Sequence, residues 1–304
     1  MMCESVTAVH THQSMTTPLA GILNIDKPSG ITSHDVINRV RRLAQMRRVG
    51  HAGTLDPLAT GVLLVCLGRA TRLVEYLTGQ PKTYESVIRM GQTTDTYDAE
   101  GAITAERPIT FTEADLAQAI TRFQGEIEQV PPMYSAVKQA GQPLYKLARQ
   151  GKEVERPSRR VTIYKLEVLN WQPPFLSLRI VCSKGTYIRS LAHDLGEMLG
   201  CGGHIAALRR AAVGDFRLDT AVSLNDLTSD NLENYLLPMD TAVSHLPRLD
   251  LPEPEASQLL MGQTVPRQPE QPAAELVRAY GAGGRFIGVV RANEAVWQAR
   301  KMFP

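Results

Sequence analysis

VGHAGTLDPLATGVLLV, residues 49–65, places a single aspartate, Asp56, in a turn rich in Gly, Pro and Thr, directly before an apolar run. The apolar residues that follow, GVLLVCLG, predict a central buried strand. Two roles are open for the aspartate. It can stabilise the turn, because Asp side chains bond the backbone two residues on and Asp-Pro favours turn initiation. Alternatively, it supplies a carboxylate for chemistry. The peptide alone favours the first role.

Composition and motif content exclude several common classes of site. The chain has 304 residues, of which 43% are hydrophobic, enough for one large or two modest domains. The four cysteines form no C-x-x-C pair, so neither a zinc site nor a disulfide framework is expected. The seven histidines are not placed at metal-ligand spacing. Phosphate-binding glycine motifs and the G-x-S-x-G elbow are missing from the sequence, so no cofactor is expected.

The predicted location is the cytoplasm. Scattered cysteines fit a reducing compartment. Residues 1–20 lack the basic start and apolar stretch of a signal peptide, and we interpret them as a flexible extension. The longest apolar run, Val62 to Leu67, is far too short to span a membrane.

Charge is segregated along the chain although the net charge is only +2. Residues 39–48 carry five arginines and no acid, and residues 145–160 carry six Lys or Arg against two Glu. Residues 218–247 contain no Lys or Arg and several acids. Each segment alone would fit a solvated surface. Together they favour a polarised surface with a polyanion on one side.

The order of predicted elements indicates an α+β fold around one large, mixed, mostly antiparallel sheet. Strands and helices follow one another without regular βαβ alternation. Helices are expected from Ser33 to about Gln45, over 69–79, from Thr112 to Phe123, over about 143–150 and after Thr186, where Ser33 and Thr186 are the expected caps. A linker at 246–255 separates the catalytic region, 21–245, from a small β-rich module, 246–304.

Five motifs then appear in order between about Gly21 and Gly214: LNIDKPSGITSHDVINRVRR, VGHAGTLDPLATGVLLVCLGRATR, KTYESVIRMGQTTDTYDAEG, PPMYSAVK and SKGTYIRSLAHDLG. Together they resemble the successive motifs of the TruB family of tRNA pseudouridine synthases. The resemblance implies the pseudouridine synthase fold with a PUA-like C-terminal module. It also implies that the basic insert, about 138–160, is a mobile thumb that clasps the T-arm.

The resemblance assigns roles to particular residues. The catalytic carboxylate of the family falls on Asp56, and the arginine expected to pair with it falls on Arg189. His51 would fill the stacking space that a flipped base leaves, and Tyr84 would lie against the uracil. The remaining residues implied at the substrate are Tyr187, Leu208 and Lys27, although Leu208 also fits an ordinary core residue and Lys27 a rigid turn.

The implied reaction is isomerisation of uridine 55 in the tRNA T-loop to pseudouridine. It proceeds by base flipping, cleavage of the glycosidic bond, rotation of the base and reattachment through C5. It requires no cofactor, no metal and no obligate protein partner, and the expected form is a monomer that binds tRNA and no membrane. Two alternatives stay open: a dyskerin-like synthase directed by a guide RNA, and a non-catalytic RNA-binding or RNA-folding protein on the same scaffold.

Overall fold

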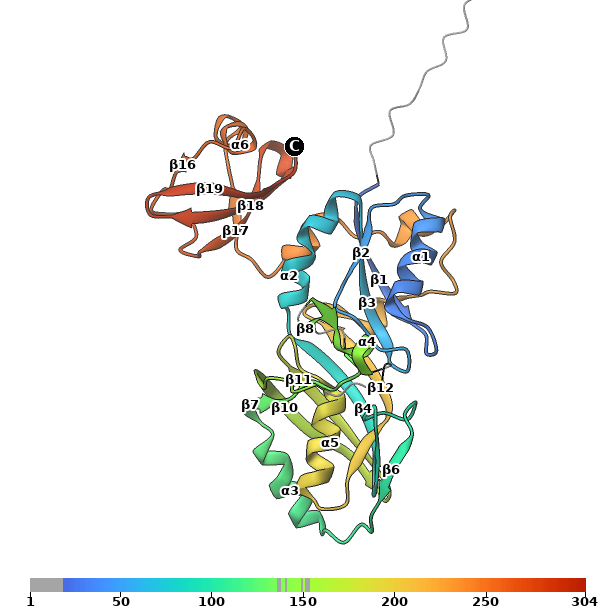
Figure 1. Ribbon diagram of the computed structural model, residues 1–304. Coiled ribbons are helices and arrows are strands. Elements are labelled where there is room, and N and C mark those ends of the chain that lie inside the picture. Colours follow the sequence, from blue (N-terminus) through green and yellow to red (C-terminus); the bar gives the residue numbers. More distant parts are fainter. Residues whose placement is uncertain (1–18, 136–137, 140, 149, 151–153) are drawn as a thin grey trace, which may run out of the picture.

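The computed structural model describes residues 19–304 except 136–137, 140, 149 and 151–153. The predicted extension, apart from its last two residues, and parts of the predicted thumb therefore lie outside the described residues. Figure 1 shows a long central body and a smaller C-terminal module beside it. The described elements mix strands and helices around one large sheet, which confirms the predicted α+β class.

The large sheet has ten strands, and most of its pairings are antiparallel. Its main path runs β14-β1-β3-β12-β4-β11-β10-β7, while β2 pairs with β3 and β13 with β12. In path order the strands are Val222–Ser223, Gly21–Lys27, Thr60–Leu67, Gly203–Val213, Lys82–Met90, Phe175–Cys182, Arg159–Gln172 and Gly125–Gln129; β2 is Val49–Ala52 and β13 is Phe216–Arg217.

The two halves of the large sheet are joined by a short pairing between β3 and β12. These strands pair in parallel through only two positions, Thr60 with Arg209 and Gly61 with Arg210. Gly61 has a φ of +100°, and a Cβ there would lie 2.3 Å from the Arg210 carbonyl oxygen. Only glycine fits this approach. The apolar run after Asp56 therefore begins where the two halves of the sheet join.

Helices α1, Ser33–Leu43, α3, Glu113–Arg122, and α5, Ile188–Met198, bury amphipathic faces against the main core. In Figure 1, α1 lies beside β1 and β2, and α3 and α5 lie together over the other half of the sheet. Val36, Ile37 and Val40 form the buried face of α1, while most of its arginines are partly or fully exposed. The other described helical elements are η1, Gly68–Leu73, α2, Val74–Gly79, α4, Leu144–Ala148, η2, Leu218–Thr220, η3, Leu232–Tyr235, and η4, Met239–Val243.

Two predicted helix caps were wrong. Helix α1 is capped by Thr32, whose hydroxyl accepts from the Asp35 amide in a reciprocal capping box, while Ser33 bonds another segment. At α5 the cap is Tyr187, and the Thr186 hydroxyl donates to the Ser183 carbonyl instead. The Ser33 hydroxyl bonds Leu55 of a different loop, and the Thr186 hydroxyl bonds its own preceding turn, so neither is available to cap its helix.

Other boundaries also differ from the predictions. Residues 69–79 form a 3-10 segment followed by α2 rather than one helix, and VGHA forms the short strand β2. The polar segment 91–101, which ends the third motif, contains β5, Gln92–Thr94, which pairs with β6, Ile103–Glu106. The remaining short hairpin joins β8, Lys138–Gln139, to β9, Gln142–Pro143.

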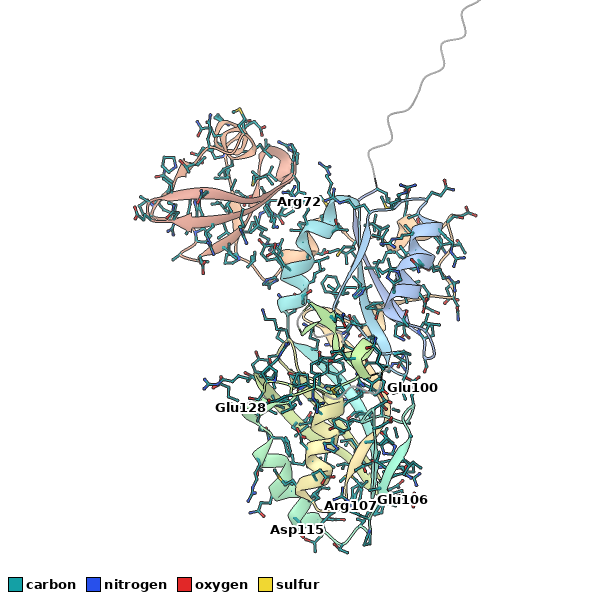
Figure 2. All side chains as sticks on the ribbon, viewed as in Figure 1. Arg72, Glu100, Glu106, Arg107, Asp115 and Glu128 are labelled. Carbon is teal, nitrogen blue, oxygen red and sulfur yellow. The ribbon has the colours of Figure 1, made fainter. Side chains whose placement is uncertain are left out.

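The C-terminal module is a five-stranded sheet with its own core and one helix. The order is β15-β17-β18-β19-β16, made of Arg248–Asp250, Leu276–Tyr280, Phe286–Asn293, Val296–Met302 and Val265–Pro266, with α6, Glu253–Leu260, and the short turn η5, Ala282–Gly284. Arg72, labelled in Figure 2, donates to the Met302 carbonyl at 2.6 Å and lies over the Phe303 ring. The predicted β-rich module is confirmed.

Candidate active site

Asp56 lies in the loop 53–59 that connects β2 to β3, and other residues hold this loop in place. The Ser33 hydroxyl of α1 accepts from the Leu55 amide at 2.8 Å and donates to the Leu55 carbonyl at 2.9 Å. The Arg210 guanidinium donates to the carbonyls of Gly53 and Val62. In the described part of the chain, no hydrogen bond joins the Asp56 carboxylate to the backbone of its own turn. The carboxylate is therefore free to face a substrate.

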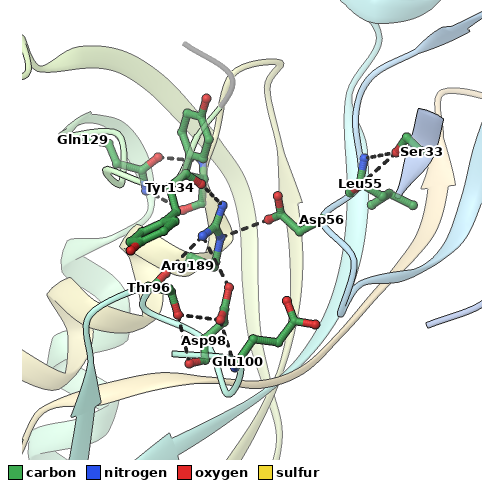
Figure 3. A network of polar contacts seen from close by, with 10 residues as sticks. Ser33, Leu55, Asp56, Thr96, Asp98, Glu100, Gln129, Tyr134 and Arg189 are labelled. Atoms are coloured by element: carbon green, nitrogen blue, oxygen red, sulfur yellow. Dashed lines mark hydrogen bonds and ion pairs between the residues drawn. The ribbon is translucent and has the colours of Figure 1, made fainter. Parts of the chain in front are cut away.

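Arg189, at the start of α5, faces this carboxylate from the other half of the sheet. Its Nε lies 3.0 Å from Asp56 Oδ2, and its Nη1 lies 3.3 Å from Asp98 Oδ2. The same guanidinium donates to the carbonyls of Thr96 and Tyr134, at 3.0 and 2.7 Å. Figure 3 shows these contacts converging on Arg189, whose side chain is only 6% exposed. Four contacts thus fix the cation beside Asp56.

Asp98 is itself held in a defined position. Its Oδ1 accepts from the Thr96 hydroxyl at 2.6 Å and from the Glu100 amide at 3.1 Å. Asp98 thereby ties the loop after β5 to the guanidinium of Arg189. Asp98 belongs to the third of the family-like motifs, but the sequence did not single it out. The acidic, polar composition of this motif was the available signal.

The electrostatics of Asp56 combine opposing influences. Burial by the surrounding walls raises the pKa of its carboxyl, the Arg189 guanidinium opposes this rise, and the negative charge of Asp98 adds to it. The side chain nevertheless keeps 39% of its surface exposed. Burial by the surrounding walls favours the neutral carboxyl, whereas the exposed surface of the side chain and the Arg189 cation favour the ionised form.

The ion pair lies where two pockets adjoin, and both pockets include Asp56 and Arg189 in their walls. The first pocket, of about 250 Å³, is also lined by Tyr84, Tyr187 and Leu208. Tyr84 and Leu208 are each 8% exposed. Its dimensions and its aromatic and aliphatic walls suit a flat, uncharged ring. Lys82 and Arg210, which sequence reasoning missed, complete its polar side.

The second pocket, of about 540 Å³, lies on the other side of the ion pair. His51, on β2, lines it together with His34, Asp98 and Glu100. Burial lowers the pKa of His51, and the Arg210 cation lowers it further, so the ring is neutral near pH 7. The structure therefore places His51 next to Asp56 but outside the pocket that holds Tyr84.

Lys27 supports the loop of Asp56 from inside the protein, although the family resemblance implies that it contacts substrate. Its side chain is fully buried at the end of β1, and its Nζ donates to the carbonyls of Pro28, Ile31 and Pro57. Burial lowers the pKa of this amine to about 8, while Asp56 opposes the change. Among the described residues that line the two pockets, Lys27 does not occur. Its ammonium supports the turn under Asp56.

The described residues contain no group of three or more His, Cys, Asp or Glu that could hold a metal ion. No helix among them is both long and apolar enough to cross a membrane.

Three models of known protein families match most of the chain between residues 41 and 299. Residues 41–188 match the model of the N-terminal domain of TruB family pseudouridylate synthases. Residues 189–244 match the C-terminal domain of tRNA pseudouridylate synthase B, and residues 247–299 match the C-terminal region described as pseudouridine synthase II TruB.

Curated relatives cover most of the chain at high identity. A tRNA pseudouridine synthase B of Pseudomonas aeruginosa is 50% identical over 278 residues, which are 89% of this chain and 91% of the relative. A tRNA pseudouridine synthase B of Ralstonia nicotianae is 47% identical over 291 residues, covering 93% and 92% of the two chains.

Solved structures give the same fold. A structure described as an H/ACA RNP bound to a substrate RNA containing 2'-deoxyuridine matches with a TM-score of 0.72 and 26% identity, covering 93% of this chain and 85% of the other. A Cbf5-Nop10-Gar1 complex matches with the same TM-score, 28% identity and the same coverage. The family models and the relatives together show that this chain belongs to the TruB family of pseudouridylate synthases.

Proposed function

We propose that this enzyme isomerises uridine 55 in the T-loop of tRNA to pseudouridine. The observation that carries the proposal is the Asp56–Arg189 ion pair at the wall of a pocket lined by Tyr84, Tyr187 and Leu208. The tRNA substrate is supported by relatives named tRNA pseudouridine synthase B at 47–50% identity. The family resemblance supplies position 55.

In the proposed reaction the target uridine leaves the base stack and enters the pocket of Tyr84. Extrusion of a base costs a few kcal/mol, and stacking on an aromatic ring returns roughly 1–3 kcal/mol per base. The Tyr84 ring supplies this stacking, and Tyr187 and Leu208 enclose the uracil. His51, in the adjoining pocket, is placed to occupy the space that the base leaves.

The carboxylate of Asp56 then acts at the ribose. It either attacks C1′, so that the bond from C1′ to uracil N1 breaks as an ester forms, or it removes a proton from C2′ and leaves a glycal. In both routes the electron pair of the broken bond goes to N1. The released uracil turns within the pocket, and its C5 bonds to C1′ as the ester bond to Asp56 breaks or, from the glycal, as Asp56 returns its proton to C2′. The proton on C5 is then lost and N1 gains one. Atoms and charge balance without a cofactor.

Arg189 has two tasks in this scheme. It favours the ionised form of Asp56, which both routes need, and it fixes the carboxylate at the junction of the two pockets. Because Asp98, Thr96 and Tyr134 hold the guanidinium from three other directions, Arg189 cannot swing away with the substrate.

The solved relatives from H/ACA particles raise a second candidate, a synthase directed by a guide RNA. The lower identity of these structures, 26–28%, favours the tRNA enzyme. One assay separates the two and also separates both from a non-catalytic RNA-binding protein.

The purified chain is mixed with an unmodified tRNA transcript, without guide RNA, protein partner or added cofactor, and pseudouridine is mapped by position. We expect one modified site, at position 55, and none in a matched transcript with cytidine there. A chain that binds the transcript but leaves position 55 as uridine would contradict the proposal.

A further inference from the structure

The backbone of Tyr187 is held by a side chain that has no part in the function described so far. Tyr187 is the N-cap of α5, and its own side chain makes no capping hydrogen bond. Its carbonyl accepts the first helical bond, from the Leu191 amide. Its amide belongs to neither a strand nor a helix. The amide needs a partner, because buried backbone polar groups are rarely left unpaired, and the carbonyl oxygen can accept a second hydrogen bond.

Gln129 supplies both hydrogen bonds. Its Oε1 accepts from the Tyr187 amide at 2.7 Å, and its Nε2 donates to the Tyr187 carbonyl at 2.9 Å. Gln129 is the last residue of β7 and is 2% exposed. Its carboxamide therefore bonds both backbone polar groups of Tyr187. Figure 3 shows Gln129 beside the polar contacts of Arg189.

The segment that follows Gln129 is joined to α5 at the next residues as well. We call residues 129–134 the strap. The Ser190 hydroxyl donates to the Val130 carbonyl at 2.8 Å, and Arg189 donates to the Tyr134 carbonyl at 2.7 Å. The contact of Gln129 with Tyr187 is the first of these contacts along the strap, and it is the one to which the strap contributes a side chain. It fixes the residue whose ring lines the pocket.

We propose that Gln129 is a positioning residue for the isomerisation, because its carboxamide fixes the Tyr187 backbone and thereby the pocket wall and the start of the helix that carries Arg189. This inference rests on the proposed function. A carboxamide is required here, since it combines one donor and one acceptor in a single plane. Gln129 acts through Tyr187 and does not contact the reacting atoms.

The decisive variant is Gln129→Glu, because its chemistry can be reversed by pH. An ionised Glu keeps the acceptor for the Tyr187 amide but presents a second acceptor to the Tyr187 carbonyl. Protonation restores the donor. Burial raises the pKa of a carboxyl, so this protonation occurs within an accessible acid range. Gln129→Met has a similar length and lacks both bonds at every pH. Gln124→Glu, exposed just before β7, is the matched charge control.

Single-turnover pseudouridine formation and tRNA affinity are measured at pH 8 and pH 5.5 for the three variants and the wild type. At pH 8 we expect Gln129→Glu to be folded, to bind tRNA within about twofold, and to react about ten- to a hundredfold more slowly. At pH 5.5 its rate relative to the wild type recovers severalfold. Gln129→Met keeps the same relative deficit at both values, and Gln124→Glu matches the wild type.

Two results would overturn the inference: a wild-type rate for Gln129→Glu at pH 8, or a deficit that acid does not reduce relative to the wild type. If the Glu variant does not fold at pH 8, a folded Gln129→Met that reacts at the wild-type rate overturns it equally. An inactive wild type would instead count against the proposed function, so the two failures are distinguishable.

Discussion

Two proline turns lie side by side at the ends of β1 and β3, and they use their charged residues in opposite ways. In the turn 26–30, the ammonium of Lys27 is directed into the protein and donates to three carbonyls. In the turn 53–59, the carboxylate of Asp56 bonds no backbone group of its turn in the described chain and faces Arg189. The charge of Lys27 therefore stabilises backbone, whereas the loop 53–59 holds the charge of Asp56 beside Arg189.

The two turns are connected, because one of the carbonyls that Lys27 holds belongs to Pro57, the residue after Asp56. Ser33 and Arg210 hold the same loop at Leu55 and Gly53. The comparison teaches that a charged side chain need not stabilise its own turn when its neighbours do, and this leaves Asp56 available for the catalytic role that we propose. It also yields predictions for each side of the comparison.

The largest effect is expected for Asp56→Asn. Asn makes the same turn bonds as Asp, so a turn-forming role would survive the change. An amide is a poor nucleophile and a negligible base, so a catalytic role would not. We expect single-turnover pseudouridine formation to fall by at least about 10,000-fold, with tRNA affinity and melting temperature near the wild type. Robust turnover would show that Asp56, like Lys27, only stabilises a turn.

Arg189→Lys should have the next largest effect. An ammonium keeps the charge but cannot contact Asp56, Asp98 and two carbonyls at once. We expect a rate loss of roughly a hundredfold. The Arg189 guanidinium opposes the raised pKa of Asp56 through its charge and its hydrogen bond, and an ammonium that no longer contacts the carboxylate lets that pKa rise further.

As the solution is acidified, Asp56 in the variant becomes protonated at a higher pH than in the wild type, and its active ionised form is lost earlier. The acid limb of the single-turnover pH profile should therefore move upward in Arg189→Lys. An unshifted limb, measured with melting curves as a check on folding, would show that the guanidinium does not set the ionisation of Asp56.

Tyr84→Leu probes the pocket wall rather than the charged pair. Leucine keeps apolar bulk and removes the ring that we expect to stack on uracil. We predict a rate roughly ten- to a hundredfold lower and a small change in tRNA affinity, since most affinity comes from phosphate contacts. Tyr76→Leu, a half-buried tyrosine of α2, is the control for loss of a ring. A full rate for Tyr84→Leu would make Tyr84 an ordinary core residue.

The smallest effect is expected for the double variant Arg159→Gln and Arg160→Gln. Both arginines are exposed at the start of β10. Burial raises the pKa of the Tyr187 phenol, and Arg159 is close enough to oppose that rise. The two arginines end the predicted thumb insert. We expect severalfold weaker tRNA binding and a salt dependence shallower by about two phosphate contacts, with an unchanged rate at saturation. An unchanged salt slope would place the RNA elsewhere.

Much of this organisation could be predicted from the sequence. The apolar run GVLLVCLG located the central strand β3, and the family resemblance of the surrounding motif assigned the catalytic carboxylate to Asp56. Arg189 could be paired with Asp56 only through the family resemblance, because 132 intervening residues separate them. Their contact depends on the fold, which brings the start of α5 against the loop before β3.

The residues that support the site were not predictable from local patterns. Ser33 fits a helix cap, yet its hydroxyl bonds Leu55, and Gln129 is one polar residue at a strand end, yet it holds Tyr187. In each case the partner is distant in sequence and is a backbone group. A backbone partner leaves no mark on residue type, so only the three-dimensional arrangement reveals it.

The most direct test measures rate and stability together for Asp56→Asn and Lys27→Met. If the two turns divide their tasks as described, Asp56→Asn melts like the wild type and makes no detectable pseudouridine. Lys27→Met leaves three carbonyls without their cation, so it melts at a lower temperature but, while folded, reacts within about tenfold of the wild type. The reverse pattern, an active Asp56→Asn beside a stable and inactive Lys27→Met, would contradict the account.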